Sequence, residues 1–241
     1  MGKEIERARA LARDLHEVYG DALVSVVLYG SAARGEYREG VSDLNVLVLL
    51  ADTGPEALRR GSKVARAWVA ERNPPPLLLS EPEWRGSADV FPIELSDIRD
   101  AHVVLHGADP FAGLAIDAAH LRLQCEHELK GKHIQLRERY LLSAGEPAEL
   151  EQLLMRSFPT FLVLFRTVLR LEGEPGAGDA EDVVRRTAAR VGFDPAPLLE
   201  VARARGGGAK LEPRAESPVV VGYLDAVERV VRHVDRLAHG A

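Results

Sequence analysis

"LYGSAARGEYREGVSDLN", residues Leu28–Asn45, is the stretch that decides the fold. An apolar run ends in Gly30-Ser31, a charged segment follows, and a second apolar run begins with Asp43 and Asn45. Glycine lets a phosphate come close to the backbone, and the amides that follow it at the start of a helical turn attract anions. The stretch therefore predicts a phosphate-binding turn between two strands.

The segments around this stretch predict a helix followed by a strand-turn-strand unit. Apolar residues at helical spacing predict a helix over residues 4–19, and a β-branched run predicts a buried strand over residues 22–29. A second strand is expected over residues 43–50. Because side chains alternate along a strand, Asp43 and Asn45 are expected on one face of the sheet.

The rest of the chain changes from mixed to helical character near residue 113. We expect a helix over residues 55–71 and strands over 77–80 and 89–95, the latter at a sheet edge because it contains Pro92. Helices are expected over residues 117–143, 147–172, 179–191, 195–205 and 219–238. The predicted fold class is an α/β (α+β) domain with a short mixed sheet over residues 1–113, followed by a C-terminal helical bundle over residues 114–241.

Several charged residues suit a bound polyphosphate. Arg34 and Arg38 lie within reach of the predicted turn and can neutralise phosphate charge. An acid at position 43 and an oxygen ligand at position 45 can hold Mg²⁺ that bridges a nucleoside triphosphate. For Arg34, a solvated loop charge is an equally good interpretation.

These residues resemble the signature of a known superfamily. Gly30-Ser31, Gly35 and Ser42-Asp43-x-Asn45 are similar to the motif of the nucleotidyltransferase superfamily that includes DNA polymerase beta. The likeness is greatest to its small bacterial members, the aminoglycoside nucleotidyltransferases and minimal antitoxin-type enzymes. The resemblance implies that acids hold two Mg²⁺ or Mn²⁺ ions while an acceptor hydroxyl attacks the α-phosphate of an NTP, expected to be ATP.

The resemblance also implies roles for particular residues. It implies triphosphate contacts from Gly30 and Ser31. Further nucleotide contacts are expected from Arg34 and Ser42 in the same stretch and from Lys130, which lies on the helix over residues 117–143 that could close over the nucleotide. Catalytic and metal-binding roles are expected for Asp43, Asn45 and Glu94.

Several of these assignments have purely structural alternatives. Asn45 can be a strand residue whose amide hydrogen-bonds a neighbouring loop. Glu94 takes the place of a third carboxylate on a later strand, with Asp89 and Asp97 as weaker candidates at the ends of that strand; Glu94 can also be an ordinary solvent-facing residue. For Lys130, a solvated helix face is the more common arrangement.

Asn45 departs from the superfamily pattern, which has a second acid at this place. An amide offers one neutral oxygen, so the site lacks a full negative charge where two dications would sit. Nucleotide binding through Gly30, Ser31 and one metal ion remains compatible with it. The sequence therefore leaves open an active enzyme, a degenerate nucleotide-binding or regulatory module, and a protein-interaction module.

The composition limits the partners. The 241 residues carry a net charge of −6, which argues against bulk binding of nucleic acid. Cys125 is the single cysteine, and no apolar run approaches the roughly 18 residues of a membrane span, so we expect a cytoplasmic protein without membrane contact. The expected partners are an NTP and an unidentified hydroxyl acceptor, a small molecule or a protein, held between the two domains. A homodimer is compatible with the sequence.

Overall fold

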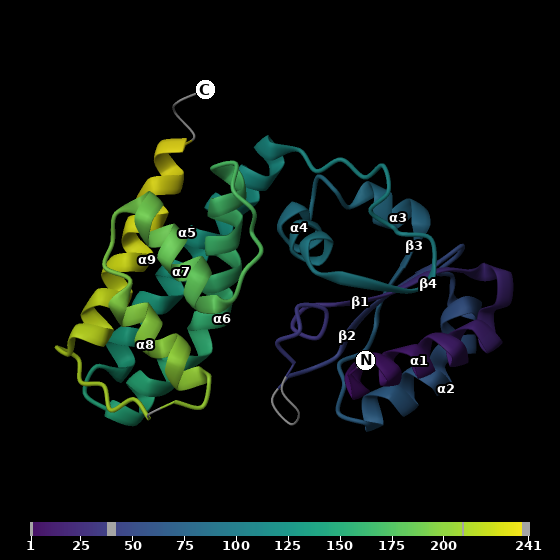
Figure 1. The fold of residues 1–241 in the computed structure, drawn as a ribbon, viewed down its shortest axis with the longest axis horizontal. Helices are drawn as coiled ribbons and strands as arrows, with labels where there is room; N and C mark the ends of the chain where they lie inside the picture. Colours follow the sequence, from purple (N-terminus) through teal and green to yellow (C-terminus); the bar gives the residue numbers. More distant parts are fainter. Residues whose placement is uncertain (1, 38–41, 209, 238–241) are drawn as a thin grey trace. The chain divides into compact units, whose positions relative to one another are not determined.

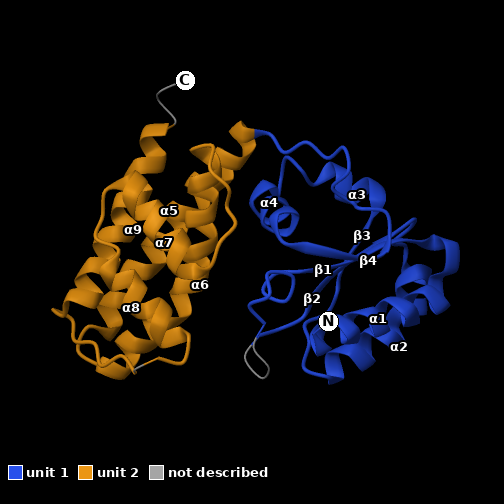
Figure 2. Cartoon of the chain, viewed as in Figure 1, with its two compact units in different colours: residues 1–117 blue, residues 118–241 orange. Residues whose placement is uncertain are grey.

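The computed structural model describes residues 2–37, 42–208 and 210–237. It consists of two compact units, residues 1–117 and residues 118–241, drawn in different colours in Figure 2. Each unit has its own core and is described by itself.

A four-stranded mixed sheet forms the centre of the first unit. The strand order is β3-β2-β1-β4, in which β1 pairs antiparallel with both β2 and β4, and β2 pairs parallel with β3. The predicted short mixed sheet is thus confirmed. The strands are β1 (Leu23–Tyr29), β2 (Asn45–Leu50), β3 (Leu77–Ser80) and β4 (His102–Gly107).

Helices cover both faces of this sheet (Figure 1). On one face, Leu15 of α1 and Trp68 of α2 pack with Val48 and the other inward-facing residues of the strands. On the other face, Trp84 of α3 and Leu95 of α4 pack against Leu47 and its neighbours. The helices are α1 (Lys3–Tyr19), α2 (Pro55–Ala70), α3 (Glu81–Gly86) and α4 (Pro92–Asp100), with a short 3-10 turn at Gly20–Ala22.

The strand expected over residues 89–95 is wrong, because this segment begins helix α4. Pro92 stands in the first turn of the helix, where the missing N–H of proline costs nothing. The apolar alternation that suggested a strand ends at Leu95, and the buried positions continue at Ser96 and Ile98 with helical spacing. The edge position expected for this strand belongs to β4, which the sequence analysis did not assign.

The second unit is helical, as predicted. Its helices are α5 (Ala118–Ser143), α6 (Pro147–Leu171), α7 (Ala180–Val191), α8 (Ala196–Arg205) and α9 (Pro218–Leu237). Pro159 lies inside α6 and has no N–H for the carbonyl of Met155, one turn earlier. Arg205 of α8 donates a hydrogen bond to that carbonyl instead, so the carbonyl keeps a partner despite the proline. Among the helices of the described residues, none has the length and apolar character that a membrane span needs.

Candidate functional site

The turn after β1 is closed by its own backbone. Gly30 has a φ of 80°, and its carbonyl accepts from the amide of Arg34 at 3.1 Å. The carbonyl of Ser31 accepts from the amide of Glu36 at 2.9 Å. Within the described part of the chain, the N–H groups of Ser31, Ala32 and Ala33 have no hydrogen-bond partner. Three consecutive free amides after a glycine of positive φ are a group of donors suited to an anion.

Asn45 lies directly beside this turn. In the antiparallel pairing of β1 and β2, Asn45 stands opposite Tyr29, the last residue before Gly30. A Cβ built on Gly30 would lie 3.2 Å from Nδ2 of Asn45, so the side-chain amide packs against the glycine. The structure thus brings together the two ends of the stretch that the sequence analysis singled out.

Asp43 precedes β2 and is exposed, while Ser42 before it is half-buried. Leu44, between Asp43 and Asn45, is fully buried in the core under α1 and α2. The buried Leu44 leaves its two neighbours on the opposite side of the chain. Asn45 shares a sheet face with Leu47 and Leu49 by strand alternation.

His102 completes a row of residues across the sheet that the sequence analysis missed. Tyr29 pairs with Asn45 on one side and with His102 on the other. The His102 ring packs against Phe111 with centroids 4.9 Å apart, and its Nε2 lies 3.4 Å from Oδ1 of Asp109. The strand that follows the site, HVVLHG, contains no acid. Its β-branched run before a glycine is the signal that could have identified it.

Glu94 is exposed and stands on helix α4, not on a strand as expected. The helix lies over the sheet face that carries Asn45, because Leu95 and Ile98 pack with Leu47 in one cluster. Glu94 is therefore on the same side of the sheet as Asn45. Its role as a third carboxylate stays a prediction.

Arg34 joins the turn to α4. Its Nη2 lies 2.8 Å from Oδ2 of Asp97, and the same nitrogen donates to the Asp97 carbonyl at 3.3 Å. The two side chains are only 13% and 20% exposed, so this pair is well shielded from solvent. Asp97, one helical turn after Glu94, thus holds the guanidinium that the sequence analysis assigned to phosphate. A phosphate contact from Arg34 has to compete with this carboxylate.

Phosphate contacts were also predicted for Lys130 and Arg38. Lys130 of α5 lies 2.6 Å from Oδ1 of Asp235 and 2.7 Å from Oε1 of Glu126, and its hydrogen bonds to them raise the pKa of the ammonium group. Its phosphate contact stays a prediction, and it requires release from two carboxylates. Arg38 lies outside the described residues.

The oxygen ligands of Asp43 and Asn45 fit a single hard cation better than two. Among the described residues, no three His, Cys, Asp or Glu side chains are grouped as a metal site. At the strand pair, Asp43 offers a carboxylate and Asn45 an amide oxygen, both of which are ligand types that Mg²⁺ accepts.

Replacing Gly30 by Ala should weaken triphosphate binding about tenfold, roughly 1.4 kcal/mol, because its methyl would press on Asn45 beside the free amides. The backbone strain of a non-glycine residue at a φ of 80° is shared with the control variant. Gly35→Ala is the matched control: its φ is 75°, but a Cβ there meets nothing within 4 Å. Calorimetric titration with ATP measures both variants. Equal losses in the two would show that the contact with Asn45 is unimportant.

Comparisons with known proteins agree with this geometry. Residues 8–107 match the family model of the nucleotidyltransferase domain. The crystal structure of spectinomycin adenyltransferase AAD(9) from Enterococcus faecialis with ATP and spectinomycin is 11% identical, covering 95% of this chain and 98% of that chain with a TM-score of 0.58. At this identity the likeness shows the fold alone.

Two further comparisons add no argument. A toxin-antitoxin structure with AMP-PNP is 15% identical, covers 56% of this chain and 95% of that chain, and has a TM-score of 0.31. No curated protein matches the sequence.

The matched residues run from α1 to the end of β4 and include the whole sheet, the Gly30-Ser31 turn and the start of β2. The resemblance of the sequence motif is thereby confirmed at the level of the domain. Residues 8–107 are thus similar to the nucleotidyltransferase domain, whose family model they match.

Proposed function

We propose that the chain binds a nucleoside triphosphate, expected to be ATP, at the turn after β1 and transfers its nucleoside monophosphate to a hydroxyl group. The observation that carries this proposal is the row of free amides at Ser31, Ala32 and Ala33 beside Asn45 and the start of β2. These donors suit phosphate oxygens, and the domain family is one of nucleotidyltransferases.

In this transfer, the acceptor oxygen forms a bond to the α-phosphorus, and the bond to the β-phosphate oxygen breaks, so that pyrophosphate leaves. Asp43 and the oxygen of Asn45 would hold Mg²⁺ or Mn²⁺, which supplies charge neutralisation on the phosphates when bound. Glu94, on the side of the sheet that carries Asn45, is the candidate to take the acceptor proton. The acceptor is a small molecule or a protein.

A second function, nucleotide binding without turnover, is favoured by two observations. Position 45 carries a neutral amide, and β4, which runs beside β1 at the site, has His102 in the row with Asn45 and no acid along its length. A site with one carboxylate at the strand pair can bind a nucleotide and one cation, but it has little charge to hold a second. Such a module would act by reporting the nucleotide to a protein partner.

Calorimetry with the four NTPs in the presence of Mg²⁺ tests the shared part of both proposals. We expect binding of at least ATP, and absence of binding at millimolar nucleotide would overturn both. Incubation with labelled ATP then separates them, using an acceptor panel of aminocyclitols, aminoglycosides and cell lysate. Label on an acceptor supports transfer, whereas tight binding with no label and no released pyrophosphate supports the regulatory module.

A further inference from the structure

A groove between α5 and α6 in the second unit collects positive charge. It forms a cavity of about 170 Å³. Lys132 and Arg139 line it from α5, seven residues apart and therefore on one helix face, and Arg156 lines it from α6. Leu136 and Phe161, both buried, form an apolar part of its wall. None of the residues that line the groove carries a carboxylate.

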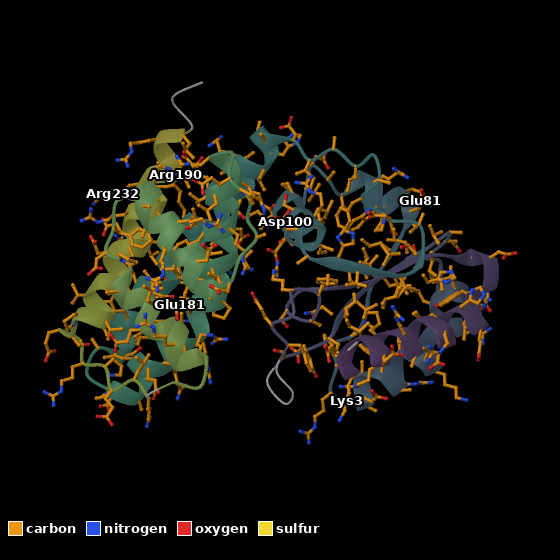
Figure 3. All side chains as sticks on the ribbon, viewed as in Figure 1. Lys3, Glu81, Asp100, Glu181, Arg190 and Arg232 are labelled. Atoms are coloured by element: carbon orange, nitrogen blue, oxygen red, sulfur yellow. The ribbon has the colours of Figure 1, made fainter. Side chains whose placement is uncertain are left out.

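Most other arginines of this unit are neutralised by neighbouring acids. Figure 3 labels two of them, Arg190 and Arg232, which pair with Glu174 and Glu228. Further pairs join Arg185 to Glu181 at 2.8 Å, Arg186 to Asp182 at 2.7 Å and Arg229 to Asp225 at 2.7 Å. Ion pairing of arginine is thus common on these helix surfaces.

Arg139 and Arg156 are exceptions. Among the residues that the structure describes, neither guanidinium makes an ion pair, and both face the same groove. Lys132 has an acidic neighbour, Glu128, at 4.0 Å, which is a long distance for an ion pair. The groove thus brings together two arginines without a paired acid and one lysine whose acidic partner is 4.0 Å away.

The wall of the groove is fixed from behind by a buried hydrogen-bond chain. Ser157 Oγ donates to the Leu153 carbonyl at 2.7 Å, so its contact with the Tyr223 hydroxyl at 2.9 Å uses the phenol as donor. Tyr223 is fully buried, and burial raises the pKa of its phenol, which keeps the proton in place. These hydrogen bonds tie α6 to α9 at the residue next to Arg156.

We propose that this groove binds a phosphate group, either free phosphate or the head of a small phosphate ester. Guanidinium groups present paired N–H donors that match phosphate oxygens, and Lys132 adds a compact positive charge. The apolar wall at Leu136 and Phe161 keeps part of the site dry, which strengthens these contacts. The site lies within the second unit and does not depend on nucleotide binding at Gly30.

The test is a titration of the full chain with inorganic phosphate and with glycerol 3-phosphate at constant ionic strength, followed by amide NMR. We expect shifts in the amides of α5 and α6, and an affinity that falls about tenfold or more in the R139Q/R156Q variant, because charged hydrogen bonds are lost. The matched control, R137Q/R185Q, removes two charges that are already paired with Glu228 and Glu181, and it should bind as wild type does.

The two ligands distinguish the sources of the phosphate. Tighter binding of glycerol 3-phosphate supports a phosphate ester, and equal binding supports free phosphate. Equal affinities in wild type and both variants would overturn the proposal, as would shifts confined to residues 30–35 of the first unit. Far-UV circular dichroism of each variant confirms that the helices are intact.

Discussion

Asn45→Asp is expected to raise the rate of nucleotide transfer about a hundredfold, equivalent to roughly 2.7 kcal/mol of transition-state stabilisation. The substitution replaces the side-chain NH2 by an oxygen and keeps the shape of the side chain beside Gly30. It places a second carboxylate on the strand that follows Asp43, where two charges can share the neutralisation of the metal and the phosphates. Release of pyrophosphate from ATP, with and without acceptor, is the measurement.

The same variant has a second readout that does not need an acceptor. Without metal, two carboxylates two residues apart repel each other, so Asn45→Asp should lower the melting temperature relative to wild type. Added Mg²⁺ should then recover it, because a cation bound by the folded state stabilises that state. Wild type should show a smaller Mg²⁺ dependence. Asn45→Ala, which offers no oxygen, serves as the control and should lose the dependence.

The two readouts of Asn45→Asp, Mg²⁺-dependent stability and turnover, can fail separately. If Asn45→Asp gains Mg²⁺-dependent stability but no turnover, the missing acid was not the only defect, and the regulatory interpretation gains support. If it gains neither, position 45 does not contact a metal. Its amide would then serve only to pack against Gly30.

The part of the site formed by β1, the Gly30-Ser31 turn and β2 could be predicted from the sequence, because its signals are local. A β-branched run, a Gly-Ser break and a second apolar run predict β1, the turn and β2 within two residues of their observed ends. Alternation from Asp43 to Leu49 also predicted which residues share a face. The proximity of Asn45 to Gly30 then follows from the antiparallel pairing of two neighbouring strands.

The part of the site formed by α4 and β4 could not be predicted, because it depends on contacts between residues distant in sequence. Phe91, Ile93 and Leu95 alternate as a strand does, and only the burial of Ser96 and Ile98 under the sheet shows the helix. β4 is half-exposed along its length, so its pattern lacks a clear buried face. The pairing of Arg34 with Asp97 spans 63 residues, and no local pattern predicts it. A helical capping box at Ser80 and Glu83 was present as a signal for α3.

Asp43→Ala should abolish the metal dependence of nucleotide binding. Asp43 is the one carboxylate at the start of β2, and it is exposed, so its removal should leave the free energy of unfolding nearly unchanged. Calorimetry with ATP should show equal, weak binding with Mg²⁺ and with EDTA, where wild type binds about tenfold or more tightly with Mg²⁺. Binding that survives in EDTA reports the contribution of the turn amides alone.

Two variants make the result specific. Asp43→Asn keeps the side-chain shape but removes the charge, so it should behave like the alanine variant if charge is what the cation needs. Asp21→Ala removes an exposed acid from the 3-10 turn at the opposite end of β1 and should bind ATP and Mg²⁺ as wild type does. A wild-type Mg²⁺ dependence in Asp43→Ala would place the cation elsewhere. Glu94, on the side of the sheet that carries Asn45, would then be the next carboxylate to replace.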